Sequence, residues 1–263
     1  MRKILMIACL VCQWGHVGET NLAGADGTSA STQPRVKKAT VASVVIRVDL
    51  PDSVGQPGLF GQMEVNLAKA ISRLDKAAAD KSVSALVLRI RNPSIGRGKL
   101  AELRAALGRV RQSGKRVYAE IHSATTGDYL LACACDEIFM PESGALMITG
   151  VRAEVTFYKR LLDKIGIQVD MLQVGKFKGA AGPVTRNGIS NEFCRQYELL
   201  LDDVYDQMVE TIAADRQLVK PRVRELVDTG LMGAAEAKAA GLIDGVAYDD
   251  QLEQTLKQRL DAD

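Results

Sequence analysis

Apolar residues follow two alternating patterns through the first half of the chain. Short β-branched runs at 41–48, 85–90 and 116–121 are typical of buried strands. Between them, apolar residues recur every three or four positions over 64–79 and 100–110, which predicts two amphipathic helices. This order predicts right-handed βαβ units around a parallel sheet, so we expect an α/β fold.

The second half of the chain repeats the same two kinds of pattern. The predicted elements are an apolar helix over 129–135, a strand over 137–140, a helix over 157–165 and a strand over 169–174. A long helix is expected to begin after Ser190, a good N-cap, and two short helices are expected between 223 and 246. The apolar stripe of the long helix is interpreted as core or as a subunit contact; it comprises Phe193, Tyr197, Leu200, Leu201, Val204, Met208 and Ile212.

The N-terminal region has the composition of an export signal. Two basic residues precede an apolar run at 4–11 that is too short to span a bilayer, and small residues follow at 23–25. We interpret residues 1–25 as a signal peptide, which predicts export to the periplasm or cell envelope, or secretion. An uncleaved N-terminus is the alternative and would allow membrane association. Residues 26–39 are polar and are expected to form a tether before a folded domain over 40–263.

Charge and composition narrow the classes of function. The 34 basic and 32 acidic residues are interspersed, so we expect no nucleic-acid partner. Once residues 1–25 are removed, Cys133, Cys135 and Cys194 remain, and they are interpreted as small hydrophobes rather than a disulfide framework. His122 is interpreted as a polar residue at a strand end. No ligand cluster surrounds it in the sequence, so neither a metal nor another cofactor is expected.

Two lysines stand out in a connection of very small residues over 174–183. Lys176 and Lys178 are flexible cations among glycine and alanine, which allow close approach to another backbone. A lysine buried in such a place loses hydration, and its pKa falls toward the range in which the amine is a base. The segment therefore indicates a catalytic lysine. The alternative is a surface lysine beside a strand end.

Several motifs occur in an order that resembles one peptidase family. They lie at 86–92, 113–119, 126–132 with 136–138, 174–178 with Pro183 and Arg186, and 241–244. In number, order and spacing they resemble the signal peptide peptidase A (SppA, protease IV) family from about Val41 to Ile243. The resemblance implies a ClpP/crotonase-like superhelix of repeated βαβ units.

The resemblance also implies a mechanism, although this chain departs from the family's pattern. In that family a serine attacks the peptide carbonyl and a neutral lysine takes its proton. The base position falls on Lys178, but the serine position holds Thr126, whose alternative role is a helix N-cap. A motif glycine is replaced by Asp128, and a carboxylate there would keep a lysine protonated. Gly96 is the candidate oxyanion donor, in a loop altered at Ile95.

Three hypotheses follow from the retained lysine and the missing serine. The first is an exported Ser-Lys-type endopeptidase that acts on small peptides such as cleaved signal peptides. The second is a non-catalytic scaffold or peptide-binding protein. The third is an enzyme completed by a partner, because the chain resembles the lysine-bearing N-terminal copy of long family members whose C-terminal copy supplies the serine. The resemblance thus implies a homo-oligomer or a serine-bearing homologous chain as partner. Binding of an acyl-CoA would suit the fold but has no support in the sequence.

Overall fold

The computed structural model shows the predicted α/β architecture over the part of the chain that it describes. The described residues are 40–47, 50–51, 66–93, 95–172, 174–175 and 177–262. The expected signal peptide (1–25) and tether (26–39) lie outside them. Among the described helices, none combines the length and the apolar character needed to cross a membrane.

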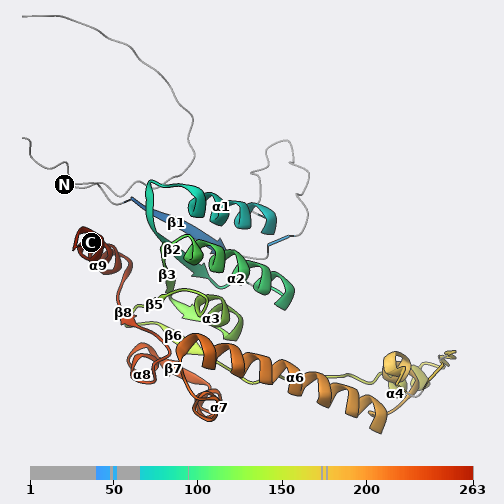
Figure 1. The fold of residues 1–263 in the computed structure, drawn as a ribbon. Coiled ribbons are helices and arrows are strands. Elements are labelled where there is room, and N and C mark those ends of the chain that lie inside the picture. The colour runs from blue at the N-terminus through green and yellow to red at the C-terminus, as the bar shows by residue number, and fades with distance from the viewer. Residues whose placement is uncertain are drawn as a thin grey trace, which may run out of the picture.

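The main sheet consists of five strands, all paired in parallel, in the spatial order β1, β2, β3, β5, β8 (Figure 1). These strands are β1 (Thr40–Arg47), β2 (Val83–Arg91), β3 (Arg116–Ile121), β5 (Glu137–Met140) and β8 (Gly245–Val246). Helices α1 (Leu67–Ala79), α2 (Arg97–Gln112) and α3 (Thr126–Ala132) lie in the connections between successive strands of β1, β2, β3 and β5. The prediction of repeated βαβ units around a parallel sheet is confirmed.

The two faces of this sheet are covered differently. On β2 and β3, Leu88 and Ala119 belong to the larger core, which also includes residues of α1, α2 and α3. Their neighbours Val87 and Tyr118 point the other way, because side chains alternate along a strand. They pack with Phe139 in a second cluster that is closed by Leu252 and Leu256 of α9 (Asp249–Ala262). Both faces are therefore buried, as expected for a parallel sheet.

A smaller sheet and a group of C-terminal helices complete the body. Its three strands are β4 (Ser123–Ala124), β6 (Ala145–Met147) and β7 (Leu231–Gly233), with β4 and β6 parallel and β6 and β7 antiparallel. The remaining body helices are α7 (Lys220–Thr229) and α8 (Ala234–Ala239). The sequence pattern did not predict β6 and β7, which are only three residues each.

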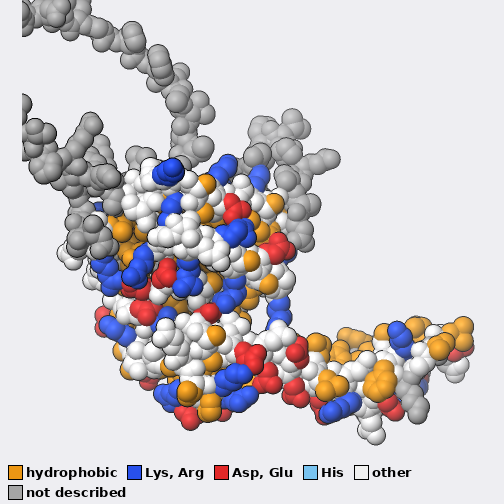
Figure 2. Space-filling model, in the orientation of Figure 1, with side chains coloured by type: hydrophobic (Ala, Val, Ile, Leu, Met, Phe, Trp, Pro, Cys, Tyr) orange, Lys and Arg blue, Asp and Glu red, His pale blue; other side chains and the backbone are white. Residues whose placement is uncertain are grey.

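Residues 150–205, which we call the arm, extend away from this body (Figure 1). The arm contains α4 (Lys159–Lys164), the 3-10 turn η1 (Gly179–Ala181), α5 (Gly182–Thr185) and the N-terminal part of α6 (Asn191–Arg216). No residue of α4 is buried. Figure 2 shows hydrophobic side chains spread over the surface of the arm.

Two predictions for the arm are corrected by the structure. The strand expected over 169–174 is wrong, because the described residues in that range lie in no strand. In α6, Ser190 caps the helix as predicted by accepting the Phe193 N–H at 3.2 Å. Of the expected apolar stripe, however, only Met208 and Ile212 are buried. The rest lies in the arm, where the subunit-contact interpretation stays open.

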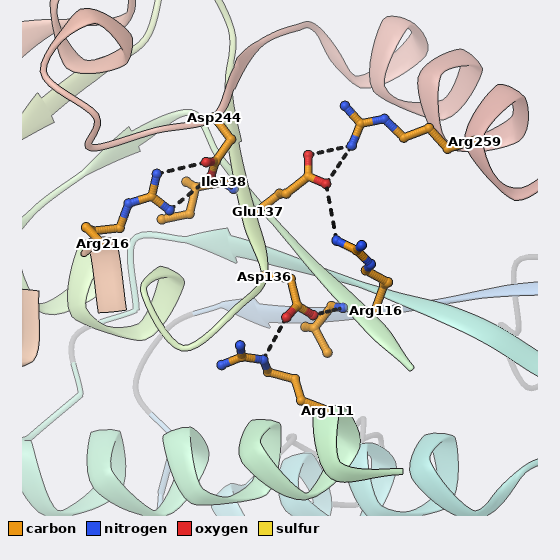
Figure 3. A network of polar contacts seen from close by, with 9 residues as sticks. Arg111, Arg116, Asp136, Glu137, Ile138, Arg216, Asp244 and Arg259 are labelled. Carbon is orange, nitrogen blue, oxygen red and sulfur yellow. Dashed lines mark hydrogen bonds and ion pairs between the residues drawn. The ribbon is translucent and has the colours of Figure 1, made fainter. Parts of the chain in front are cut away.

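Charged residues clamp the body together where strands and helices end (Figure 3). Asp136 pairs with Arg111 at 2.8 Å and also accepts the Val117 N–H at 2.8 Å. The neighbouring Glu137 pairs with Arg259 of α9 at 2.5 Å. The two acids thus lie between α2, β3 and α9 as structural partners.

The C-terminal end of α6 is also held to the body by charged residues. Arg216, in its last turn, forms two hydrogen bonds of 2.9 Å to the carboxylate of Asp244. Asp244 also accepts the N–H of Ile138 on β5 at 2.7 Å. This bidentate ion pair therefore links the long helix to β5 of the main sheet (Figure 3).

Candidate functional site

Two of the three predicted site residues come after neighbouring strands of the main sheet: Gly96 after β2, and Thr126 after β3 and the two-residue strand β4. β2 and β3 are parallel and in register, with Ile90 opposite Ile121, so their carboxyl ends meet. Asn92 turns the chain after β2 with a φ of 48°, a left-handed conformation that asparagine tolerates. Gly96 then takes the N-cap position of α2 in extended conformation. The candidate oxyanion turn therefore lies at the edge from which α3 also begins.

The start of α3 is capped by Thr125, not by Thr126. Thr125 is extended, and both its N–H and its hydroxyl donate to Asp128 Oδ2, at 2.9 and 2.8 Å. Asp128 is only 2% exposed, and its other oxygen has no hydrogen-bond partner among the described residues. The N-cap interpretation of Thr126 is thus wrong by one residue. The aspartate that replaces the motif glycine is part of the cap.

The hydroxyl of Thr126 is held on both sides by the backbone of Thr149. It accepts the Thr149 N–H at 3.0 Å and donates to the Thr149 carbonyl oxygen at 3.2 Å. Thr149 directly precedes the arm, so this pair of hydrogen bonds joins the start of α3 to the base of the arm. A hydroxyl in this arrangement must release a carbonyl before it can attack a substrate.

Lys178 lies on the arm and its side chain is exposed. It shares a small depression at the start of α6 with Arg186, Ser190 and Phe193. The next residue must be glycine, because a Cβ on Gly179 would lie 2.4 Å from the Phe193 ring. The chain therefore presents this lysine on a compact turn packed against α6.

Lys178 and Thr126 are not brought together within one chain. Lys178 lies near Phe193 at the outer end of α6, whereas the buried Met208 marks where α6 joins the body. The helix between them rises about 1.5 Å per residue, so this stretch is roughly 22 Å long. The single chain thus assembles Gly96 and Thr126 at one edge and carries the lysine elsewhere.

A cavity of about 380 Å³ lies beside the Gly96 and Thr126 edge, between α2, α3 and α6. Leu130, one helical turn after Thr126, lines it together with Gly98, two residues after Gly96. The other lining residues include Arg97, Leu100, Arg104, Gln207 and Met208. Its lining is apolar at Leu130 and Met208 and basic at Arg97 and Arg104. A larger hollow of about 750 Å³ lies between α1 and α2, and none of the three candidate residues lines it.

The buried thiols and the buried phenol near α3 do not offer another nucleophile. Cys133 and Cys135 are 2% and 5% exposed, as expected for small hydrophobes. Burial raises the pKa of Cys133 to about 12 and also raises the pKa of Cys135, so both stay protonated at neutral pH. Burial likewise raises the pKa of Tyr129, whose hydroxyl donates to the Leu242 carbonyl at 2.8 Å.

The structure surrounds His122 with acids that the sequence did not place there. His122 Nε2 lies 3.0 Å from Asp249 Oδ1 and 3.2 Å from Glu120 Oε1. The expectation that no ligand cluster surrounds this histidine is therefore wrong. Strand alternation could have paired Glu120 with His122 on one face. Nothing local in the sequence could have brought Asp249 from 127 positions further on.

Fold and site together define an α/β protein with a glycine turn and a hydroxyl at one sheet edge and a lysine on a projecting arm. The chain belongs to Peptidase family S49, whose family model matches residues 109–263, more than half of its length. The resemblance to signal peptide peptidases that the motifs suggested is thereby confirmed at the level of the family.

Relatives with related names cover most of this chain. It is 28% identical over 226 residues to the chloroplastic serine protease SPPA of Arabidopsis thaliana, covering 86% of this chain and 33% of that protein. It is 22% identical over 236 residues to a putative signal peptide peptidase SppA of Enterococcus faecium, covering 88% of this chain and 68% of the relative. Protease 4 of Salmonella typhi is 23% identical over 254 residues, covering 89% of this chain and 41% of that protein.

This chain spans only part of two of these relatives. It covers about a third of the Arabidopsis protein and 41% of the Salmonella protein. Among solved structures, a monofunctional enoyl-CoA isomerase from M. smegmatis is similar with a TM-score of 0.44 and 21% identity. That likeness covers 83% of this chain and 79% of the isomerase.

Proposed function

We propose that this chain is the lysine-bearing subunit of an exported Ser-Lys-type endopeptidase that cleaves small peptides such as released signal peptides. The single observation that carries the proposal is the position of Lys178, on an arm that extends away from its own hydroxyl-bearing edge. A lysine placed there reaches a neighbouring chain more readily than Thr126. The neighbour in this proposal is a homologous chain that carries the serine.

The exposed apolar surface of the arm supports the proposal that a neighbouring chain covers it. Leu172 and Val174, just before the lysine, are 103% and 90% exposed. Apolar surface of this kind is stabilised when another chain removes it from water. The same contact would strip water from the amine of Lys178 and favour its neutral form, which a general base requires.

In the assembled site the chemistry would divide between two chains. The neighbour's serine hydroxyl attacks the scissile carbonyl carbon while the neutral amine of Lys178 takes the hydroxyl proton. Backbone N–H groups of a glycine turn stabilise the oxyanion. The resulting ammonium of Lys178 then gives its proton to the departing amine, and water releases the acyl group in a second step that regenerates the serine.

The proposal is tested with a fluorogenic peptide that carries a signal-peptide-like apolar segment. The chain is assayed alone and after co-purification with a serine-bearing S49 homologue from the same cells. We expect activity only in the mixture, and we expect Lys178→Ala to lower kcat by about 10²–10⁴-fold. Lys164→Ala is the matched control, since Lys164 is another exposed lysine of the arm. Activity that is unaffected by Lys178→Ala would contradict the proposal.

One observation favours a second candidate function, a peptide-binding protein without catalysis. The Thr126 hydroxyl is hydrogen-bonded to the Thr149 backbone, and the neighbouring Asp128 caps α3. Both side chains at the position of the nucleophile therefore make structural hydrogen bonds. Binding of the same peptide without turnover, by the chain alone and by Thr126→Ser, is the expected result. Turnover by the unmodified chain that disappears in Thr126→Val would instead identify Thr126 as a nucleophile.

A further inference from the structure

The face of the sheet beneath α9 is apolar at one end and polar at the other. Tyr118, Glu120 and His122 alternate along β3 and its end, so all three point toward α9. Tyr118 belongs to the apolar cluster that holds Leu252 and Leu256. Glu120 and His122 lie at the carboxyl end of the strand, where Asp249 begins α9.

Three potential metal-ligand atoms meet at this polar end. They are His122 Nε2, Glu120 Oε1 and Asp249 Oδ1, and all lie within 4.8 Å of one another. The imidazole nitrogen is 3.0 Å from the Asp249 oxygen and 3.2 Å from the Glu120 oxygen. Ligand bonds of 2.0–2.2 Å in a tetrahedral site place neighbouring ligand atoms roughly 3.3 Å apart, close to the spacing seen here.

Glu120 is the buried member of the cluster, and arginines contact both of its carboxylate oxygens. This carboxylate is 1% exposed, and its Oε2 lies 2.9 Å from Arg89 Nε, yet the two form no hydrogen bond. A buried carboxylate oxygen that lacks a hydrogen bond is costly. His122 and Asp249, in contrast, are about half exposed, so water and ions can enter from their side.

The charges around the cluster leave room for a further cation. Arg91 contacts Glu120 Oε1 and lies 3.7 Å from Asp249 Oδ2, and Arg89 lies 3.5 Å from Glu253. Three carboxylates therefore face two guanidinium groups, which leaves a net negative charge on these five side chains. The two arginines also hold the carboxylates in place, as outer partners of metal ligands commonly do.

We propose that Glu120, His122 and Asp249 form a binding site for a divalent transition-metal ion, with Zn²⁺ as the best match to one imidazole and two carboxylates. Water from the open side takes the remaining position. Arg91 shifts its contact from Glu120 Oε1 toward Asp249 Oδ2 when the ion enters. The site joins the end of β3 to the start of α9 and so fastens the C-terminal helix to the sheet, independently of any peptidase activity.

The experiment measures binding of Zn²⁺ alone to the full chain, without a histidine tag and after removal of metals by a chelator. Titration calorimetry is performed on the parent and on His122→Ala and Asp249→Asn, which change half-exposed side chains. Asp250→Asn is the matched control, because Asp250 is the next residue of α9 and lies outside the cluster. A Cys194→Ser background removes the partly exposed thiol as a competing ligand.

We expect one Zn²⁺ per chain, with affinity reduced about tenfold or more by each cluster substitution and unchanged by Asp250→Asn. Zn²⁺ should also raise the Tm of the parent and of Asp250→Asn, but not that of His122→Ala. Absence of binding at about 100 µM Zn²⁺, or equal binding by all variants, would overturn the proposal. The cluster would then be an ion-pair network only.

Discussion

The body and the arm of this chain use similar apolar residues in opposite ways. In the body, leucines such as Leu103 and Leu107 are 1% and 0% exposed, and both faces of the main sheet are covered. In the arm, Leu172 and Leu200 are 103% and 57% exposed. The body completes its own core, whereas the arm carries apolar surface that one chain leaves open to water. This difference is the reason for our proposal that another chain covers the arm.

The largest difference between body and arm is expected when a leucine side chain is shortened to alanine in each region. Leu103→Ala removes a fully buried side chain of α2 and should lower the free energy of unfolding by about 2–5 kcal/mol. Leu200→Ala changes an exposed leucine of the arm, and it should alter the free energy of unfolding of the single chain by no more than about 0.5 kcal/mol. Urea unfolding followed by circular dichroism measures both. A large effect of Leu200→Ala on a single chain would mean that the arm packs on its own body.

Charges placed on the arm should disrupt assembly while sparing the fold. Leu172→Glu combined with Leu200→Glu puts two carboxylates into the proposed contact and should weaken association about 100-fold, because buried charges need partners. The measurement is light scattering over a range of concentrations. Val219→Glu is the control, since Val219 is 69% exposed but belongs to the body. Equal weakening by Val219→Glu would show that assembly does not depend on the arm.

Thiol labelling should separate the two regions by reactivity. Cys194 lies on the arm and is partly exposed, whereas Cys133 and Cys135 are buried in the body and burial raises the pKa of both. In the charged double variant of the arm, a maleimide at pH 8 should modify Cys194 at least about tenfold faster than the other two. Peptide mass mapping identifies each site. Comparable rates would indicate that the body opens as readily as the arm.

The smallest effect is expected where body and arm meet. Thr126→Val removes the hydroxyl that forms two hydrogen bonds with the Thr149 backbone. It should lower the free energy of unfolding by about 1 kcal/mol. Amide exchange around residues 148–150 should become faster, because the base of the arm loses its attachment to α3. Thr126→Ser retains a hydroxyl and should exchange like the parent. Unchanged exchange in Thr126→Val would mean that the two hydrogen bonds do not hold the arm.

The hydrophobic pattern of the sequence predicted the strands and helices of the body, whose core lies within one chain. The runs at 41–48, 85–90 and 116–121 became β1, β2 and β3, because a parallel sheet buried on both faces needs continuous apolar strands. The run at 169–174 is also apolar, but its described residues form no strand. A local pattern reports that a segment is apolar, but not which surface will cover it.

For the site, the motifs located each candidate residue but not the distances between them. Gly96 and Thr126 share an edge, as expected for residues that follow parallel strands. The separation of Lys178 from Thr126 could not be predicted, because it depends on how far α6 carries the arm from the body. The cluster around His122 was missed for a similar reason: Asp249 is brought there by α9, whose docking depends on Leu252 and Leu256.

The ion pair between Arg216 and Asp244 has a mechanical consequence for the far end of the molecule. It fixes one end of a 26-residue helix, which is roughly 39 Å long. A tilt of only about 5° at that pivot would displace the opposite tip by about 3 Å, the length of a hydrogen bond. A small change at this ion pair would therefore move the outer end of α6, beside which Lys178 lies, although Arg216 and Asp244 are at the opposite end of the helix.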